Sequence, residues 1–243
     1  MARRIKHILS QVQHRPYALP AGPWAYYQEW NSALFLHWKV PAVALNALLP
    51  PGLEAELLDG QAWISLVPFM MQRIRPRYVP AVKWLSDFQE INLRTYVCRE
   101  GKPGVYFLNI GAGKKRSALV ARWFSGLPYE PARMDFGQSE EGQRYHSRHR
   151  DFALEAVFRT GAAITEKSVL DRWLTERYCL YLEQGGQLCR FDIHHDQWPL
   201  REVNLLEFKA DYRLGHISVH RFPDLVHYSE GVQVLAWGKE WLP

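Results

Sequence analysis

A chain of 243 residues, 47% of them hydrophobic and 14% aromatic, can bury a large core, which excludes general disorder and any need for a disulfide or metal to stabilise the fold. Its net charge of +5 is compatible with nucleic acid, anionic lipid or acidic small molecules and selects none of them. The three cysteines, Cys98, Cys179 and Cys189, have no metal-ligand spacing. We therefore expect no disulfide framework, no structural metal and a reducing, cytoplasmic location.

The first 24 residues are interpreted as an N-terminal extension that precedes one domain over residues 25–243. Arg3, Arg4 and Lys6 fit a solvated helix better than a membrane anchor, because the segment lacks the apolar core of a secretory signal. No apolar run in the chain reaches the roughly 18 residues that cross a bilayer. We therefore expect no membrane partner.

The domain begins with a short apolar strand and a helix. Residues 33–38 predict the strand. Pro41 predicts a helix over 42–49 that begins with this proline at its first position, where a missing N–H costs nothing. The Pro- and Arg-rich segment 74–82 is expected to be a loop.

A hairpin is predicted between these segments. Strands over 53–58 and 61–69 flank Asp59-Gly60, which is a typical hairpin turn. The second strand has apolar residues on both faces, which indicates that both of its sides are covered.

The strand predicted over 87–98 has one apolar face and one polar face. The polar face carries Glu90, Asn92, Arg94 and Tyr96, because side chains alternate across a strand. This face is either exposed to solvent or lines the interior of a barrel. In the second case, a carboxylate and a guanidinium could bind a small ligand together.

The segment from Ser117 to Met134 gives the sharpest functional signal. Ser117 can cap a short helix, Gly126 can close it, and Pro128 prevents its continuation. The turn that follows presents Tyr129 and Glu130 in a defined position.

The C-terminal half predicts further short elements. They are a hairpin over 132–136 and 143–149, strands over 152–159, 176–182, 188–195 and 227–237, and a helix capped by Ser168. In strand 188–195, His194 shares a face with charged residues and is expected to face solvent. His195 shares its face with Phe191 and Ile193 and is expected in the interior, either as a hydrogen-bonded core residue or as a ligand-binding group.

A basic cluster occupies the 144–150 hairpin strand. It consists of Arg144, His146, Arg148, His149 and Arg150. We interpret it as a solvated surface, with nucleic-acid binding as a less favoured alternative, because outward-facing aromatic residues are not interleaved with the charges.

Taken together, the elements predict an α+β chain that is mostly β, with an antiparallel sheet closed as a barrel or sandwich and flanked by short helices. No dinucleotide, zinc-protease or nucleophile-elbow motif is present. We expect no cofactor and no metal.

Several longer stretches resemble the YqjF-like family of uncharacterised proteins, a branch of the acetoacetate decarboxylase superfamily. They are LLPPGLE (48–54), GQAWISLVPF (60–69), EINLRTYV (90–97), PGVYFLNI (103–110), GLPY (126–129), TERYCLY (175–181), HHDQWPL (194–200) and HYSEGVQVLAW (227–237). The resemblance implies an antiparallel β-barrel of the acetoacetate decarboxylase type with an internal small-molecule cavity.

The resemblance also locates the place of the nucleophile. Relatives that decarboxylate use a Schiff-base lysine in an RE-x-x-x-x-PKK pattern. In this chain Arg122 and Pro128 keep their places, whereas Tyr129 and Glu130 stand where the lysine and its activating neighbour would stand. A tyrosine cannot form an imine, so Schiff-base decarboxylation at this position is excluded on chemical grounds.

Other residues of the relatives' pocket are compared in the same way. Glu90 matches a decarboxylase glutamate, whereas Asn31 falls where a substrate-binding arginine would be. Lys114 and Lys115 could supply a relocated amine, although a solvated loop explains them better.

These observations lead to three hypotheses. The first is a cytoplasmic pocket for an oxo or carboxylic compound, either as a binding protein or as a lyase- or isomerase-like enzyme. In that hypothesis Tyr129 and Glu90 are the catalytic candidates, and the ligand-binding candidates are Asn92, Arg94, Arg122 and His195. The second is a structural or interaction module, such as a homo-oligomer whose cavity has filled, and the third is a nucleic-acid binder.

Overall fold

The computed structural model describes residues 2–113, 129–149 and 152–243, and these residues form a mostly β structure with short helices. The helices are α1 (Ala2–Ser10), α2 (Ala42–Asn46), α3 (Lys83–Ser86) and α5 (Val169–Thr175). The longer strands are β1 (Tyr26–Val40), β3 (Ala62–Pro76), β4 (Phe88–Arg99), β5 (Lys102–Ala112), β7 (Arg133–Gln138), β8 (Gln143–His149), β9 (Phe152–Ala163), β10 (Cys179–Gln184), β11 (Gln187–His194), β12 (Leu200–Leu214) and β14 (Leu225–Ala236). The short strands are β2 (Glu54–Ala55), β6 (Glu130–Pro131), β13 (Ile217–Val219) and β15 (Glu240–Trp241). The helix predicted after Ser117 lies outside the described residues.

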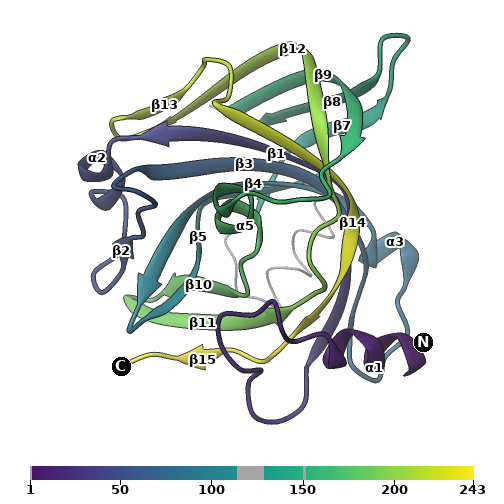
Figure 1. Ribbon diagram of the computed structural model, residues 1–243, viewed down its shortest axis with the longest axis vertical. Helices are drawn as coiled ribbons and strands as arrows, with labels where there is room; N and C mark the ends of the chain where they lie inside the picture. Colours follow the sequence, from purple (N-terminus) through teal and green to yellow (C-terminus); the bar gives the residue numbers. More distant parts are fainter. Residues whose placement is uncertain (1, 114–128, 150–151) are drawn as a thin grey trace.

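The strands of the described residues join in one 15-stranded sheet whose central path closes on itself. Neighbouring strands follow the order β11-β10-β5-β4-β3-β1-β14, and Ile193 of β11 pairs with Ala236 of β14, so the two ends of this path meet. We call these strands the ring. In Figure 1 the ring surrounds a central region onto which α5 projects.

A second group of strands extends from the ring and is called the wing. It consists of β12, β9, β8 and β7, which follow β14 in the strand order and lie to one side of the ring in Figure 1. Within the described residues the pairing is antiparallel, except that β5 runs parallel to β10 and to β6. The expectation of an antiparallel sheet is therefore correct only in part.

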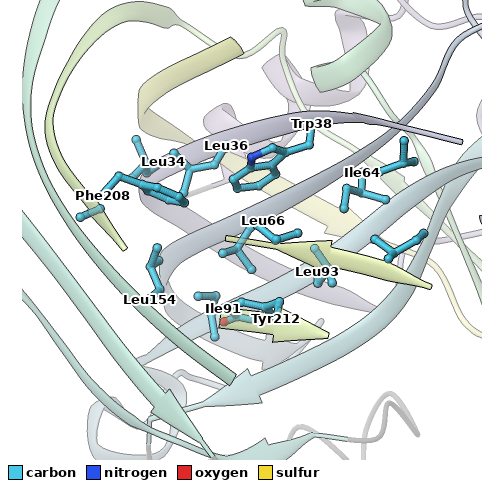
Figure 2. Close-up of a cluster of buried hydrophobic side chains, with 14 of the residues drawn as sticks. Leu34, Leu36, Trp38, Ile64, Leu66, Ile91, Leu93, Leu154, Phe208 and Tyr212 are labelled. Carbon is cyan, nitrogen blue, oxygen red and sulfur yellow. The ribbon is translucent and has the colours of Figure 1, made fainter. Parts of the chain in front are cut away.

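Strands β1, β3 and β4 separate two apolar regions, because successive side chains point to opposite faces of a sheet. On the wing side, Leu66 and Leu93 are at most 1% exposed and belong to a buried cluster with Phe208 of β12, which we call the outer core. Figure 2 shows its members Leu34, Leu36, Trp38, Ile64, Leu66, Ile91, Leu93, Leu154, Phe208 and Tyr212. On the opposite face, Phe35 and Val67 belong to a cluster inside the ring. The prediction that strand 61–69 is covered on both sides is confirmed.

Several predicted elements are also confirmed. The predicted strand 87–98 is β4, and the predicted hairpin is β7 and β8, in which Phe136 lies opposite Tyr145. Ser168 caps α5, since its hydroxyl accepts the Asp171 N–H at 3.1 Å and the Asp171 carboxylate accepts the Ser168 N–H at 2.8 Å.

The hairpin predicted over 53–69 is wrong. The turn forms, because Leu58 and Gln61 make a bridge around Asp59, whose φ is 51°. The segment before the turn does not pair with β3, however. Only Glu54 and Ala55 form a strand, and they pair with β4. Strand β3 instead pairs with β1 and β4, which are longer and better covered partners.

Other boundaries were also wrong. Strand β1 begins at Tyr26 rather than at residue 33, and β3 continues to Pro76 into the predicted loop, because Tyr26 pairs with Pro76. Pro41 caps α2 instead of starting it, and that helix ends at Asn46.

Strand β12 was not predicted. A register shift between Leu205 and Glu207 in its pairing with β9 interrupts the two-residue alternation that normally indicates a strand. The local sequence therefore hides a strand that forms most of its pairs within the wing.

The placement of His194 was also wrong, since this residue is 0% exposed. The N-terminal segment covers it: its Nε2 is 2.7 Å from the Ile8 carbonyl oxygen, and its Nδ1 is 3.2 Å from Nη1 of Arg15. The alternation within β11 could not reveal cover that comes from residues about 180 positions away. Arg3 and Arg4 of α1 are exposed, as expected.

The described members of the basic cluster fit a solvated strand. Arg144 and Arg148 are exposed, and Arg144 pairs with Asp135 at 2.9 Å. Tyr145 is 3% exposed, and its hydroxyl donates to the Ser32 carbonyl oxygen. This tyrosine therefore offers no stacking platform on the surface. Arg150 lies outside the described residues.

Candidate functional site

The ring holds a cavity of about 110 Å³. Most of its wall is apolar and comes from several strands, including Phe35 of β1, Phe69 of β3, Phe107 of β5 and Phe191 of β11, with Trp198 after β11. An apolar wall with a few polar groups is typical of small-molecule sites.

Glu90 and Tyr129 form a hydrogen-bonded pair in this wall. The Tyr129 hydroxyl donates to Oε2 of Glu90 at 2.9 Å, and the Asn92 amide donates to Oε1 at 3.4 Å. Glu90 is 2% exposed and Tyr129 is 8% exposed. Their positions follow from the sheet: Glu90 lies opposite Ala112 of β5, and the residue after Tyr129 pairs with Gly111 of the same strand.

Burial controls the protonation of this pair. It raises the pKa of Glu90 to about 7, although the hydrogen bonds from Tyr129 and Asn92 act in the opposite direction. Burial and the Glu90 charge raise the pKa of Tyr129 well above its ordinary value. Near neutral pH the carboxyl group can therefore gain or lose a proton, while the phenol keeps its proton and can donate a hydrogen bond.

Arg94 lies further along the same face of β4. It is 8% exposed, its Nη2 donates to the Leu174 carbonyl oxygen at 3.3 Å, and its guanidinium lies 5.5 Å from the centre of the Phe35 ring. Its Nε is buried without a hydrogen-bond partner among the described residues, as is Oδ1 of Asn92. The solvent-exposed interpretation of this face is therefore wrong, and its residues Glu90, Asn92 and Arg94 line the cavity.

Arg177 also lines the cavity and was missed in the sequence. Its Nη1 pairs with Oε2 of Glu56, and its Nε donates to the Trp173 carbonyl oxygen at 2.6 Å. The available signal was a lone cation in the otherwise apolar run that follows Glu176. The sequence pattern predicts a strand that begins at residue 176, whereas β10 begins only at Cys179.

A row of buried polar side chains supports the end of the cavity near α5. The Tyr96 hydroxyl donates to the Leu174 carbonyl oxygen at 2.9 Å and bonds to the Ser65 hydroxyl. Ser65 bonds to His37 at 2.6 Å, and His37 lies 3.2 Å from His227. The row crosses β4, β3, β1 and β14 and ends at α5, where His227 bonds to Asp171 at 2.9 Å. It therefore fixes the helix whose Leu174 carbonyl holds Arg94.

His195 lines the cavity and faces inward, as its alternation with Phe191 and Ile193 predicted. Its ring lies 4.8 Å from the Tyr178 ring, and its Nδ1 bonds to the Asp196 carbonyl oxygen at 2.7 Å. Burial lowers its pKa to about 4. The imidazole is therefore neutral near pH 7 and can act there as a hydrogen-bonding group.

The structure brings Glu90, Asn92, Arg94, Tyr129 and His195 together around one cavity. The remaining ligand-binding candidate, Arg122, lies outside the described residues, together with Lys114, Lys115 and Pro128.

Two other residues that were compared with the relatives' pocket, Glu130 and Asn31, do not line this cavity. The Glu130 carboxylate accepts a hydrogen bond from Asn109 and lies 3.3 Å from His149. Asn31 donates to Gln72 at 2.6 Å.

The described residues contain no group of three or more His, Cys, Asp or Glu side chains placed to hold a metal ion. Their helices also lack the length and apolar character that crossing a bilayer requires.

The family model of DUF2071, described as an uncharacterized conserved protein, matches residues 27–233. This chain belongs to that family. Its similarity to the uncharacterized protein YqjF of Bacillus subtilis agrees with this assignment: the two are 38% identical over 233 residues, which cover 93% of this chain and 96% of YqjF.

Solved structures place this DUF2071 chain in the acetoacetate decarboxylase-like fold. An acetoacetate decarboxylase-like enzyme from Sphingomonas wittichii RW1 has a TM-score of 0.57 at 15% identity, covering 93% of this chain and 97% of that one. The enduracididine biosynthesis enzyme MppR, complexed with pyruvate, has a TM-score of 0.58 at 13% identity, covering 94% and 93%. The acetoacetate decarboxylase of Legionella pneumophila has a TM-score of 0.58 at 14% identity, covering 98% and 95%. At these identities the likeness establishes the fold alone.

Proposed function

We propose that this protein binds a small oxo or carboxylic compound in the cavity of a barrel-like ring, and that Glu90 and Tyr129 act on it as base and acid. One observation carries the proposal: a hydrogen-bonded phenol and carboxyl pair, with the carboxyl pKa near 7, faces an apolar cavity. A proton-transferring group works best when its pKa lies near the operating pH.

The proposed chemistry starts at the carbon next to the ligand carbonyl. The Glu90 carboxylate takes a proton from this carbon, and the electron pair of the broken C–H bond forms the C=C bond of an enolate. The carbonyl oxygen takes the displaced pair, and the Tyr129 hydroxyl stabilises it by turning its hydrogen bond from Glu90 to this oxygen. Return of the proton from Glu90 to the same carbon gives exchange, and return to another carbon gives isomerisation.

The proposed chemistry does not pass through an imine at position 129, because a phenol has no amine to condense with a carbonyl. A binding protein without turnover is the weaker form of the proposal. The filled-cavity module has less support, since Tyr129 borders a cavity of about 110 Å³. We also propose one domain over residues 25–243 and a cytoplasmic location, which the three free cysteines favour.

Hydrogen exchange tests the acid–base role directly. The purified protein is incubated in D₂O with 2-oxobutyrate and with 3-oxobutyrate, and deuterium entry next to the carbonyl is followed by NMR. We expect catalysed exchange in the wild type and in Tyr106→Phe, a control tyrosine that does not line the cavity. Loss of exchange in Tyr129→Phe and in Glu90→Gln supports the proposal, and exchange at the wild-type rate in both variants overturns it.

Borohydride trapping tests the exclusion of an imine. The protein is reduced in the presence of a panel of β-keto acids, and its intact mass is measured. We expect no covalent adduct. An adduct of substrate mass would assign the chemistry to a lysine elsewhere in the chain.

A further inference from the structure

The charges around the cavity do not balance at its α5 end. Arg94 and Arg177 both line the cavity and are 8% and 6% exposed. Glu56 pairs with Arg177. Among the described residues no carboxylate forms an ion pair with Arg94.

Glu90 does not neutralise Arg94. They lie four positions apart on β4, which corresponds to about 13 Å along the strand. Among the described residues, the shift in the pKa of Glu90 comes from burial and from the hydrogen bonds of Tyr129 and Asn92. Within the part of the chain that the structure describes, one positive charge at the α5 end is therefore left without an opposite charge.

Unused hydrogen-bond donors lie on the same two guanidiniums. Nε of Arg94 and Nη2 of Arg177 are buried and have no hydrogen-bond partner among the described residues. Nη2 of Arg94 donates to the Leu174 carbonyl oxygen, and Nε and Nη1 of Arg177 donate to the Trp173 carbonyl oxygen and to the Glu56 carboxylate. The free donors are therefore held in place by well-anchored side chains.

An unneutralised buried charge is costly, and a buried donor without an acceptor adds to that cost. A bound anion removes both costs, because its oxygens accept the free N–H groups and its charge offsets the excess. A planar carboxylate matches guanidinium donors particularly well. With one net positive charge, a monoanion is favoured over a dianion.

The size of the cavity limits the rest of the ligand. A cavity of about 110 Å³ is smaller than the roughly 150 Å³ that accommodates benzene in an engineered core. Beyond the guanidiniums the wall is formed largely by aromatic and aliphatic side chains. The rest of the ligand is therefore a short apolar chain.

We propose that Arg94 and Arg177 form an anion subsite that binds the carboxylate of a short monocarboxylate and directs the rest of the ligand toward Glu90 and Tyr129. This proposal rests on the proposed function in that both use one cavity. It adds the class of ligand, its orientation and a second arginine.

Three probes of similar size test the subsite by isothermal titration calorimetry: butyrate, its neutral amide butyramide, and the dianion succinate. We expect the wild type to bind butyrate at least about tenfold more tightly than either of the others, because a hydrogen bond to a charged group contributes about 1.5–3 kcal/mol. Equal affinities for butyrate and butyramide, or no detectable binding of butyrate, would overturn the subsite.

Variants assign the preference to the two arginines. Arg94→Met is expected to bind butyrate and butyramide within about twofold of each other, and Arg177→Met to reduce the preference. Arg94→Lys retains the positive charge and is expected to keep part of the preference for butyrate. Arg213→Met is the matched control, because the Arg213 side chain is 78% exposed and outside the cavity. Circular dichroism verifies that Arg94→Met is folded. If the folded variant keeps the full preference for butyrate over butyramide, the assignment of the subsite to Arg94 is refuted. If Arg94→Met does not fold, the affinities of Arg94→Lys for the two probes decide the assignment.

The same probes separate this proposal from the acid–base role. If butyrate binding depends on Arg94 while deuterium exchange is unaffected in Tyr129→Phe and Glu90→Gln, the acid–base role fails and the subsite stands. If deuterium exchange depends on Tyr129 while the protein binds butyrate no more tightly than butyramide, the anion subsite is refuted and the acid–base role stands.

Discussion

The two faces of strand β4 have the same burial but opposite chemistry, and its neighbour β3 extends the apolar face. Toward the wing, Leu66 and Leu93 pack in an outer core of apolar side chains. Toward the ring interior, Glu90, Asn92 and Arg94 are also buried, yet they border a cavity. Asn92 and Arg94 each keep a polar atom that has no hydrogen-bond partner among the described residues. Burial alone therefore does not separate a stabilising region from a functional one. What separates the two regions is the presence of unpaired polar groups in the wall of a cavity.

The largest effect is expected where the polar face meets the cavity. Replacement of Tyr129 by Phe removes a hydroxyl and leaves Oε2 of Glu90 without its donor, so the free energy of unfolding is expected to fall by about 1–3 kcal/mol. The rate of exchange or turnover is expected to fall about 10²–10⁴-fold, the usual contribution of a positioned acid or base. Steady-state rates and urea unfolding of the same preparation measure both. An unchanged rate would remove Tyr129 from the chemistry.

Adjacent residues of β3 compare the two faces directly. Leu66→Ala opens a hole in the outer core and is expected to lower the free energy of unfolding by about 2–5 kcal/mol. Val67→Ala is the matched control, because Val67 already borders the cavity and the substitution only enlarges existing space. We expect Val67→Ala to lower the free energy of unfolding by about 1–2 kcal/mol. Urea titrations of both variants measure the difference, and a Val67→Ala cost equal to that of Leu66→Ala would contradict the distinction between the faces.

The raised pKa of Glu90 predicts a pH-dependent stability. The unfolded chain releases this proton near the ordinary value of 4.5, and the folded protein releases it near 7. The contribution of Glu90 to stability is therefore fully present below about pH 4.5 and is lost as the pH rises through 7. The loss is about 3 kcal/mol.

Glu90→Gln isolates this effect, because the buried histidines titrate equally in both proteins. The free energy of unfolding of the variant, relative to the wild type, is expected to increase by about 3 kcal/mol between pH 4.5 and pH 8. Denaturant unfolding at several pH values measures it. A constant difference over this range would show that the Glu90 pKa is not raised.

The smallest effect is expected at Arg94. Arg94→Met removes an unneutralised buried charge but also a hydrogen bond and a contact with the Phe35 ring. We expect the ligand-free protein to be as stable as the wild type or more stable by about 1 kcal/mol. Thermal unfolding without carboxylate in the buffer measures this. A loss of 3 kcal/mol or more would indicate that a carboxylate of the chain already neutralises the charge.

Much of the site could be predicted from local sequence. The alternation of β4 places Glu90, Asn92 and Arg94 on one face, and the alternation of the strand predicted over 188–195 places His195 inward. Both signals are local, because a strand repeats every two residues whatever lies around it. The capping of α5 by Ser168 is equally local, since its partner Asp171 lies three residues away.

The wrong predictions share a non-local cause. His194 is buried because the distant Ile8 and Arg15 cover it. Arg177 reaches the cavity because strand β10 begins later than its apolar pattern indicated. Residues 54–55 pair with β4 because competition among strands, and not the turn beside them, chooses the partner.

The sequence by itself therefore determined the alternation of its strands, the caps of its helix α5 and the absence of an amine at position 129. Only the tertiary structure decided which polar face would be sealed inside the ring and which arginines would meet there. The physical reason is that side-chain direction follows from local backbone geometry, whereas burial and the balance of charge depend on the elements that fold against each strand from far along the chain.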